Sequence, residues 1–271
     1  MALLAGTPER LRELGLELTV LGAGCALPQK GRGPAGYAVR GDQLEGALLF
    51  DCGPGTIRSL ADYEIGLLDI TCVVISHFHI DHILDLFALA FARRNPKLEG
   101  EPLSKLRVIG PKGLRALLQS MPPSMQVLRE DSLTTCIEVD LDRNGEGAVA
   151  IPGASLRCSR AFHVEESLSW RLDSAGKSLV YSGDTGETVA LSGLAAGADV
   201  LIAECALSGA EKPLRHLNGR TAGQIAQAAG VSRLVLSHFY PHVSPAHEAV
   251  EAAKVFGGEV LIAVDGTRLG F

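Results

Sequence analysis

Short apolar runs recur along the whole chain, and polar or glycine-rich segments separate them. Many of these runs are rich in β-branched side chains, which is typical of strands buried in a sheet. We expect strands over residues 16–21, 37–40, 47–50, 70–75, 106–110, 154–160, 168–172, 178–182, 199–203, 233–237 and 259–264.

Stripes of apolar residues at helical spacing lie between several of these strands. The clearest stripe runs from Ile83 to Asn95, where positions 83, 84, 86, 87, 90 and 91 are apolar and share one face of a helix. Further helices are expected near Thr56, from about Gly113, over 221–229 and over 246–256. Strands that alternate with helices predict an α/β protein.

The composition adds limits on size and on partners. The chain has 271 residues, 46% of them hydrophobic, and a mean hydropathy of +0.20, which suffices for the core of one large domain or two small ones. The formal net charge is −6. Proteins that bind nucleic acid by broad contact with phosphates are usually basic, so this kind of binding is disfavoured, although a local basic rim is compatible with the charge.

Six cysteines are scattered at positions 25, 52, 72, 136, 158 and 205, without a CxxC pair. We expect them to be reduced packing residues of a cytoplasmic protein. The first ten residues lack the basic start and the long apolar core of a signal peptide. No apolar run is long enough to span a membrane.

One segment concentrates three imidazoles and a carboxylate within six positions. It reads SHFHIDH over residues 76–82, directly after a predicted strand and before a predicted helix. Residues i and i+2 of an extended segment point the same way, so His77 and His79 can reach one metal ion together. Asp81 and His82 project differently, toward a second ion. Neutral imidazole and carboxylate ligands suit zinc, manganese or iron.

Other reactive side chains also follow predicted strands directly or nearly so. Four of them are His163, Asp184, Glu204 and His238. The ends of strands can meet at one edge of a layered scaffold, so we expect these side chains to converge near the histidine cluster.

Weaker signals occur at three further places. The glycine-rich turn 22–28 lacks the known phosphate-binding fingerprints, so it is either a plain hairpin connection or a phosphate cradle, with Arg32 as a candidate for binding an anionic substrate. Asp51 ends a buried strand and either orients a metal-bound imidazole or acts as a helix cap or turn acid. Asp265 is a second candidate for such an orienting role.

These motifs resemble those of the metallo-β-lactamase fold superfamily over nearly the whole chain. The resemblance implies a four-layer αββα sandwich with a dinuclear metal site at one edge, in a single hydrolase domain over 1–271. The residues that carry it, in the family's order, are His77-x-His79-x-Asp81-His82, His163, Asp184 in Ser-Gly-Asp-Thr and His238 in Leu-Ser-His. By resemblance, one ion is held by His77, His79 and His163, the other by Asp81, His82 and His238, and Asp184 bridges them.

Within that superfamily the chain is most similar to the ribonuclease Z branch and its phosphodiesterase and arylsulfatase-like relatives. Residues 21–28 and 50–56 resemble the N-terminal motifs of that branch. Its His-Glu-Ala-Thr stretch matches the run from Ala203 to Ala206 in the Glu and the Ala, and a later His-Ser-Thr matches His216-Leu217-Asn218 in the His. The tRNA-binding arm of the usual long-arm type is missing, because His163 and Asp184 are only 21 positions apart.

The resemblance and the ligand set predict a metal-dependent hydrolase of phosphodiesters or related anionic esters. Two divalent ions, with zinc favoured over manganese or iron, would share a hydroxide that attacks phosphorus. His216, oriented by Glu204, would protonate the leaving alkoxide, and Asp81 would help to orient the nucleophile. Alternatively, His216 is an ordinary polar residue before a helix.

Several other functions stay open on the same site. They are a ribonuclease Z-type RNA endonuclease, an arylsulfatase-like enzyme, a carboxylic ester or lactone hydrolase, and a metal-binding protein without turnover. The expected partners are a small anionic ester in preference to nucleic acid, no membrane and, by analogy with the branch, a second copy in a homodimer.

Overall fold

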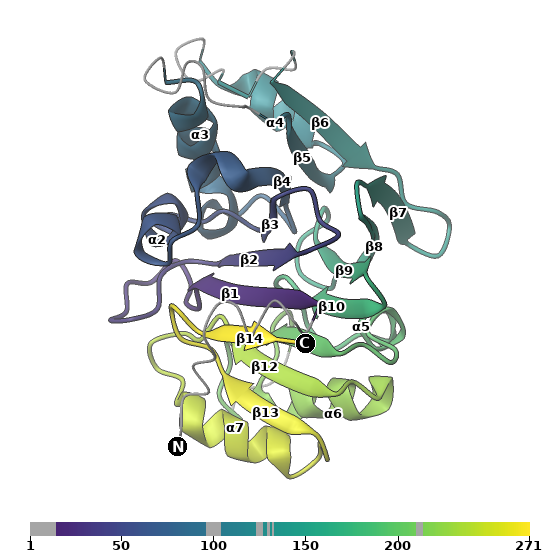
Figure 1. The fold of residues 1–271 in the computed structure, drawn as a ribbon. Coiled ribbons are helices and arrows are strands. Elements are labelled where there is room, and N and C mark those ends of the chain that lie inside the picture. Colours follow the sequence, from purple (N-terminus) through teal and green to yellow (C-terminus); the bar gives the residue numbers. More distant parts are fainter. Residues whose placement is uncertain (1–14, 96–103, 123–126, 129–130, 132, 210–213) are drawn as a thin grey trace.

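The structure is a computed structural model that describes residues 15–95, 104–122, 127–128, 131, 133–209 and 214–271. The N-terminal segment 1–14, on which the expectation about a signal peptide rests, lies outside the described residues. Within the described part, two β-sheets pack face to face, and helices cover their outer sides (Figure 1). This is the predicted αββα sandwich.

The first sheet has seven strands among the described residues, in the order β14-β1-β2-β3-β4-β5-β6. Strands β3 to β6 run parallel to one another, and the remaining neighbours are antiparallel. The bounds are β1 Leu16–Gly22, β2 Gly36–Gly41, β3 Ala47–Phe50, β4 Ile70–Val74, β5 Leu106–Pro111, β6 Thr134–Val139 and β14 Arg268–Gly270.

The second sheet also has seven strands in the described part, in the order β13-β12-β11-β10-β9-β8-β7. Strands β10 to β13 are parallel, and β7 to β10 form an antiparallel meander. The bounds are β7 Glu146–Ile151, β8 Ala154–Arg160, β9 Leu168–Ser174, β10 Lys177–Tyr181, β11 Val200–Glu204, β12 Arg233–Ser237 and β13 Glu259–Ile262.

Helices lie on both outer faces. Those of the first half are α2 Thr56–Asp62, the short 3₁₀-helix η1 Leu67–Asp69, α3 Ile80–Arg93 and α4 Leu114–Ser120, and those of the second half are α5 Val189–Leu194, α6 Gly219–Ala229 and α7 Pro245–Ala253. The first group packs on one sheet and the second group on the other, so each sheet is covered on both faces. Such strands are buried on both sides, which explains why many of them are continuous apolar runs.

The central core lies between the two sheets. It includes Tyr37 and Phe50 of the first sheet and Trp170 and Tyr181 of the second, all of them at most 3% exposed. The ring of Tyr181 lies 5.0 Å from that of Tyr37 and 5.7 Å from that of Phe50. Aromatic residues are few in this chain, and several of them gather in this layer, where they join the two halves.

Helix α3 begins earlier than the sequence predicted. It starts at Ile80 in place of Ile83 and ends at Arg93 in place of Asn95. His79 is its N-cap with extended backbone, and Asp81 lies in the first turn, where the helix dipole favours a negative charge. The prediction followed only the apolar stripe, so it assigned the first turn, with Asp81 and His82, to a loop.

Five short elements were not predicted at all: η1, β6, β7, β14 and α5. Strand β7 is an edge strand made mostly of small residues and alternates between exposed and half-buried positions, so its apolar signal is weak. Strand β14 has three residues and α5 has six, too few for a recognisable period. The last predicted strand also ends at Ile262 in place of Val264.

The glycine-rich turn after β1 is a close-packed connection to β2. A Cβ atom on Gly22 would lie 1.8 Å from the carbonyl oxygen of Pro34, so only glycine fits there. Gly22 faces Gly36 across the β1–β2 pair, next to an irregularity in the register. This geometry fits the hairpin alternative.

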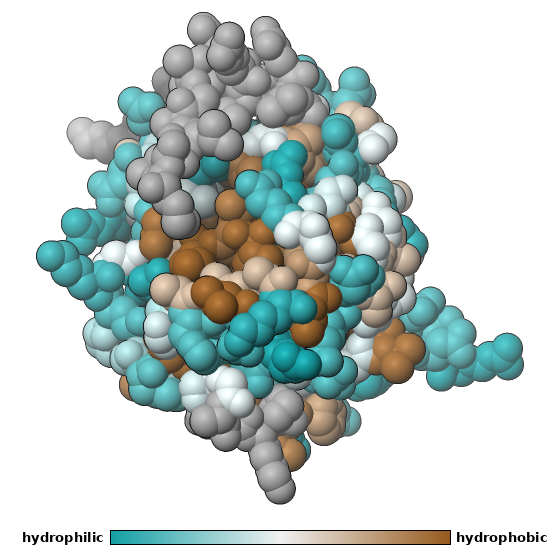
Figure 2. Space-filling view, turned by 90° about the horizontal axis from the view of Figure 1, so that it is seen from below, coloured by the Kyte–Doolittle hydropathy of each residue, from teal (hydrophilic) through white to brown (hydrophobic). Residues whose placement is uncertain are grey.

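Part of the apolar surface stays exposed. Figure 2 shows the molecule from below, with apolar atoms gathered near the middle of this face and polar atoms around them. No helix in the described part of the chain has the length and apolar character needed to cross a membrane.

Candidate metal centre

Side chains from both sheets meet at one edge of the sandwich. His77 and His79 follow β4, and Asp81 and His82 occupy the first turn of α3. The second sheet supplies the other three candidates, from the segments after β8, β10 and β12: His163, Asp184 and His238. These seven side chains form two groups that could each hold a metal ion.

The first group consists of His77, His79, His163 and Asp184, whose nearest ligand atoms all lie within 4.8 Å of one another. His79 Nδ1 and His163 Nε2 are 3.2 Å apart. The Oδ2 atom of Asp184 lies 3.9 Å from His77 Nε2 and 3.8 Å from His163 Nε2.

The second group consists of Asp81, His82 and His238. The Nε2 atoms of the two imidazoles are 3.3 Å apart, and Asp81 Oδ2 lies 3.7 Å from His82 Nε2 and 3.5 Å from His238 Nε2. The Oδ1 atom of Asp184 lies 3.4 Å from each of these two nitrogens. Asp184 therefore faces one group with each of its carboxylate oxygens.

Two atoms at the centre of this cluster are buried without a hydrogen-bond partner: His77 Nε2 and Asp184 Oδ1. Buried polar atoms that lack a partner are costly, and a cation between the groups would satisfy both. Imidazole nitrogens and carboxylate oxygens are also the donor set that zinc, manganese and iron accept. The residues present therefore fit divalent metal ions.

Asp51 lies behind the second group and is fully buried. Its carboxylate accepts hydrogen bonds from His82 Nδ1 at 2.6 Å, from the amide and hydroxyl of Ser76 at 2.7 Å each, and from the hydroxyl of Tyr181 at 2.7 Å. Because Nδ1 of His82 is engaged, its Nε2 faces the cluster. Of the two alternatives for Asp51, this geometry matches the acceptor that orients an imidazole.

Two further imidazoles, those of His77 and His163, are also held from behind. His163 Nδ1 lies 3.2 Å from the carbonyl oxygen of Arg215, and His77 Nδ1 lies 3.0 Å from the hydroxyl of Ser76. Each of these contacts leaves the Nε2 atom of the ring facing the cluster.

His216 and Glu204 form a pair beside the cluster. Glu204 Oε1 lies 2.7 Å from His216 Nδ1 and also accepts from the amide of Thr185 at 2.9 Å, so the carboxylate itself is fixed. Burial alone would lower the pKa of His216, but the hydrogen bond and the charge of Glu204 outweigh it and raise that pKa above its usual value. The ring of His216 lies 4.7 Å from that of His163, so the pair borders the candidate centre.

The cluster perturbs the ionisation of its own members. Burial, together with the nearby ring of His82, holds the pKa of His77 well below its usual value. Burial would likewise lower the pKa of His82, yet the carboxylates of Asp184 and Asp51 outweigh it and raise that pKa. Burial would raise the pKa of Asp81, but the hydrogen bond with His238 and the charge of His82 lower it to about 2. Such a concentration of perturbed groups is typical of a functional site.

Arg32 and Asp265 lie farther from the cluster. The Arg32 guanidinium carbon is 5.4 Å from the ring centroid of Phe239, the residue after His238. Asp265 accepts from the amides of Ala23 and Gly33 at 2.9 and 2.8 Å. These two hydrogen bonds hold the loop that carries Arg32, and neither of them involves an imidazole.

Sequence reasoning missed three residues that support the centre: Ser76, Tyr181 and Tyr240. Ser76 and Tyr181 bind Asp51, and the ring of Tyr240 lies 5.8 Å from His216 and 6.0 Å from His238. Ser76 and Tyr240 stand one and two positions from a predicted ligand, so proximity in sequence was an available signal. Tyr181 reaches Asp51 across 130 positions, and no local pattern indicates that contact.

The paired sheets, the flanking helices and the His/Asp cluster at their edge together define a metallohydrolase of the metallo-β-lactamase fold. The family model described as "Beta-lactamase superfamily domain" matches residues 47–239, and the chain belongs to this superfamily. The fold implies divalent metal ions, for which the cluster supplies the donor groups.

Individual proteins of known sequence or structure show which members of the superfamily the chain resembles. The chain is 28% identical over 277 residues to the protein named Ribonuclease Z from Mycobacterium bovis (strain BCG / Pasteur 1173P2), and the match covers 94% of this chain and 98% of that protein. Among solved structures it is similar to the metallo-β-lactamase fold protein YhfI from Bacillus subtilis, with a TM-score of 0.83, 25% identity and coverage of 94% and 99%. It also shares the fold of human tRNase Z, short form, with a TM-score of 0.74, 23% identity and coverage of 93% and 98%.

The match with the mycobacterial protein limits what the short interval between His163 and Asp184 implies. The short interval between His163 and Asp184 set this chain apart from long-arm ribonucleases Z. However, the mycobacterial protein that carries the name Ribonuclease Z is covered almost from end to end. The short interval therefore does not separate the chain from proteins of that name. The expectation of a small anionic ester in preference to nucleic acid finds no support among these relatives.

Proposed function

We propose that this protein hydrolyses phosphodiester bonds with the help of two divalent cations. The observation that carries the proposal is the position of Asp184, whose two carboxylate oxygens face the two groups of candidate ligands. The relatives named Ribonuclease Z support a phosphodiester as the substrate, since RNA is a chain of such bonds.

In this proposal His77, His79 and His163 would hold one cation, Asp81, His82 and His238 would hold the other, and Asp184 would serve both. We favour zinc, with manganese or iron as alternatives, because imidazole and carboxylate donors suit all three. Bound divalent ions would supply positive charge for the developing negative charge on the phosphate and would acidify water. We assign the whole chain, residues 1–271, to a single hydrolase domain.

The residues around the ions have separate tasks. His216 donates a proton from Nε2 to the leaving alkoxide, and Glu204 holds its Nδ1 in place. The raised pKa of His216 supports this role, because the ring must be protonated at neutral pH to act as an acid. Asp81 helps to orient the attacking water. Arg32, fixed near Phe239, binds a phosphate oxygen of the substrate.

Within this proposal, we favour RNA as the substrate. The mycobacterial relative, matched over 94% of this chain, favours a ribonuclease Z-type endonuclease over hydrolysis of a small ester. The net charge of −6 argues against broad phosphate contact, so we expect RNA to bind through a few local contacts. A homodimer and a cytoplasmic location remain part of the proposal. The six cysteines are buried and form no disulfide in the structure, which supports a reducing compartment.

Two diesters with different leaving groups test the role of His216 as proton donor. We would compare bis(4-nitrophenyl) phosphate, whose phenolate leaves without a proton, with a ribodinucleotide, whose alkoxide needs one. For His216→Ala we expect turnover of the dinucleotide to fall about 100-fold or more, with a much smaller loss on the activated diester. His247→Ala, on an exposed residue of α7, is the matched control and should change neither.

Other outcomes would replace the proposal. Equal losses on both diesters would remove His216 from the role of proton donor. Turnover of a carboxylic ester, lactone or sulfate ester by protein that leaves diesters intact would favour one of the alternative hydrolases. A metal-loaded protein that is inert toward every substrate would favour a metal-binding protein without turnover.

A further inference from the structure

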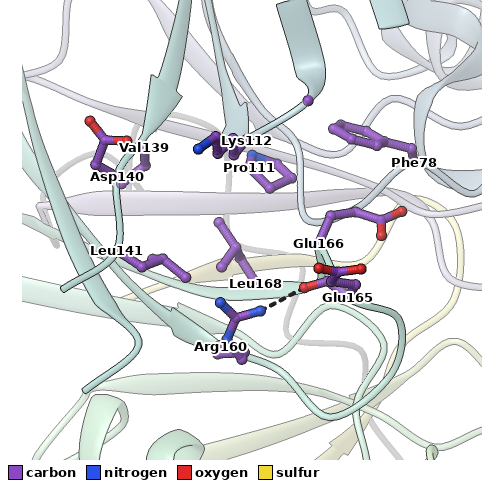
Figure 3. A pocket seen from close by; sticks show the side chains of 11 residues that line it. Phe78, Pro111, Lys112, Val139, Asp140, Leu141, Arg160, Glu165, Glu166 and Leu168 are labelled. Carbon is purple, nitrogen blue, oxygen red and sulfur yellow. Dashed lines mark hydrogen bonds between the residues drawn. The ribbon is translucent and has the colours of Figure 1, made fainter. Parts of the chain in front are cut away.

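A pocket of about 590 Å³ lies at the same edge of the sandwich as the candidate metal centre (Figure 3). Its lining comes from the segment after β4, from the ends of β5 and β6 with the residues that follow them, and from the connection between the end of β8 and the start of β9. Strands β4, β5 and β6 are parallel, so their carboxyl ends share the edge that also carries His77 and His79. The volume is typical of a site for a small molecule.

Two loops form walls of both the pocket and the metal centre. Phe78 lines the pocket and stands between His77 and His79. In an extended segment, neighbouring side chains point to opposite sides, so Phe78 faces the pocket while the two histidines face the candidate metal centre. Glu165 lines the pocket two positions after His163. The pocket and the candidate metal centre therefore lie on the two sides of these loops, and a substrate held at the centre would reach the pocket by passing over them.

The inner surface of the pocket is apolar. Pro111, Val139 and Leu168 are buried residues that line it, and half-buried Phe78 and Leu141 complete this surface. Figure 3 shows the ring of Phe78 on one side and Leu168 near the middle of the view. An aromatic side chain beside aliphatic ones is a surface on which a flat ring can stack.

The rim of the pocket is charged and mixed in sign. Lys112 and Arg160 offer hydrogen-bond donors, and Asp140, Glu165 and Glu166 offer acceptors. Arg160 Nη1 donates to the carbonyl oxygen of Glu165 at 2.7 Å, which fixes its position. With three acids against two bases, the rim disfavours a second phosphate. It suits an uncharged ring that carries both donors and acceptors on its edge.

We infer that this pocket binds the nucleobase on one side of the scissile phosphodiester, stacked on Phe78, with its edge hydrogen-bonded to the charged rim. This inference rests on the proposed function, and it makes the base a determinant of substrate choice besides the phosphate.

The test compares two diesters with the same leaving group. One is thymidine 5′-(4-nitrophenyl phosphate), and the other is its abasic analogue, in which hydrogen replaces the base. For the metal-loaded wild-type protein we expect kcat/KM to be about tenfold higher for the diester with the base, in line with one stacked base. Leu141→Trp fills the pocket and should bring this ratio to about one, with unchanged kcat/KM for the abasic diester.

Two further variants guard against an effect of folding. Val250→Trp adds the same side chain at an exposed position of α7, far from the pocket lining, and should keep the tenfold ratio. Lys112→Ala removes one donor of the exposed rim without touching the apolar surface, and should lower the ratio in part. A ratio that Leu141→Trp leaves at about ten, or a loss that is equal on both diesters, would overturn the inference.

A binding measurement separates this inference from the proposed function. Thymidine itself, which has no phosphate, should bind the wild-type protein in saturation-transfer NMR and fail to bind Leu141→Trp. Thymidine binding without hydrolysis of any diester would refute the proposed function and leave the pocket assignment standing. Hydrolysis of both diesters at equal kcat/KM, without thymidine binding, would refute the pocket assignment alone.

Discussion

Asp51 shows how much one buried carboxylate can organise. It receives four hydrogen bonds, from Ser76, His82 and Tyr181, and these donors come from both sheets. The sequence indicated that an acid at the end of a buried strand needs a partner, which is a local argument. It could not choose between orienting an imidazole and capping a helix, because the choice depends on contacts with residues far along the chain.

Asp51→Asn is the residue-level prediction. The amide keeps the shape but has one acceptor oxygen in place of two, so it cannot satisfy all the donors that converge on Asp51. We expect zinc affinity at the site that contains His82 to fall by about 10- to 100-fold, measured by competition with a chromophoric chelator.

Asp85→Asn provides the control for that measurement. Asp85 Oδ2 accepts from the amides of Gly55 and Ile57 at the start of α2, at 2.9 and 3.1 Å. Both amides donate to one oxygen, and asparagine keeps one acceptor oxygen, so Asp85→Asn should change the unfolding free energy by about 0.5 kcal/mol or less and leave zinc affinity unchanged. Equal zinc affinity in Asp51→Asn and Asp85→Asn would contradict the role given to Asp51.

At the scale of elements, α3 combines two functions in one helix. Its first turn presents Asp81 and His82 to the candidate centre, and the face that packs on the first sheet consists of Ile83, Leu86, Phe87, Leu89 and Ala90. The predicted stripe was wrong at two positions, because Leu84 and Phe91 are exposed. The stripe was visible in the sequence because periodic burial leaves a periodic pattern. The first turn was missed because its residues are chosen for the site and not for packing. The edge strand β7 left little signal because it is short and made mostly of small residues, although Val149 and Ile151 of its inner face pack against the central core.

A pair of leucines on α3 tests its packing. Leu86 is fully buried, whereas Leu84 is 44% exposed, and both lie in the same helix. Leu86→Ala should lower the unfolding free energy by about 2–5 kcal/mol, because it leaves a cavity in the core. Leu84→Ala should change it by about 0.5 kcal/mol or less. Denaturation by urea, followed by circular dichroism, measures both. Similar losses in the two variants would mean that this face of α3 does not pack as described.

At the scale of the whole molecule, the residue pattern predicted strands that alternate with helices and reactive side chains after several strands. The sandwich and the order of the candidate ligands came from the resemblance to the metallo-β-lactamase superfamily. The sequence did not indicate the pocket beside the centre. That pocket is lined by the segment after β4, the ends of β5 and β6 and the connection from β8 to β9, and none of these segments alone indicates a pocket. The contacts of Arg32 and Asp265 likewise could not be predicted, because they join loops that are far apart in the sequence.

Removal of metal should destabilise the whole protein. A ligand that binds only the folded state adds about 2.7 kcal/mol at 100 times its dissociation constant, which corresponds to a rise in Tm of roughly 5–10 °C for a chain of this size. We therefore expect a chelator to lower Tm by this amount and added zinc to restore it, as measured by scanning calorimetry.

Asp184→Asn tests whether that shift arises at the candidate centre. Without the carboxylate that faces both groups, the variant should show little or no rise in Tm with zinc. A rise equal to that of the wild-type protein would place the stabilising ion elsewhere. Asp199→Asn, at a carboxylate that binds Ser178 away from the cluster, should keep the full rise.

The division of the candidate ligands between the two sheets sets an order of events during refolding. In the unfolded chain a zinc ion meets His77, His79, Asp81 and His82 as neighbours, while His163, Asp184 and His238 are distant in sequence. Only when the two halves dock does the complete set of donors exist, so tight uptake of metal must lag behind assembly of the sandwich. Stopped-flow refolding with a fluorescent zinc indicator would then report the docking of the halves as a delayed phase, whose rate is independent of the zinc concentration.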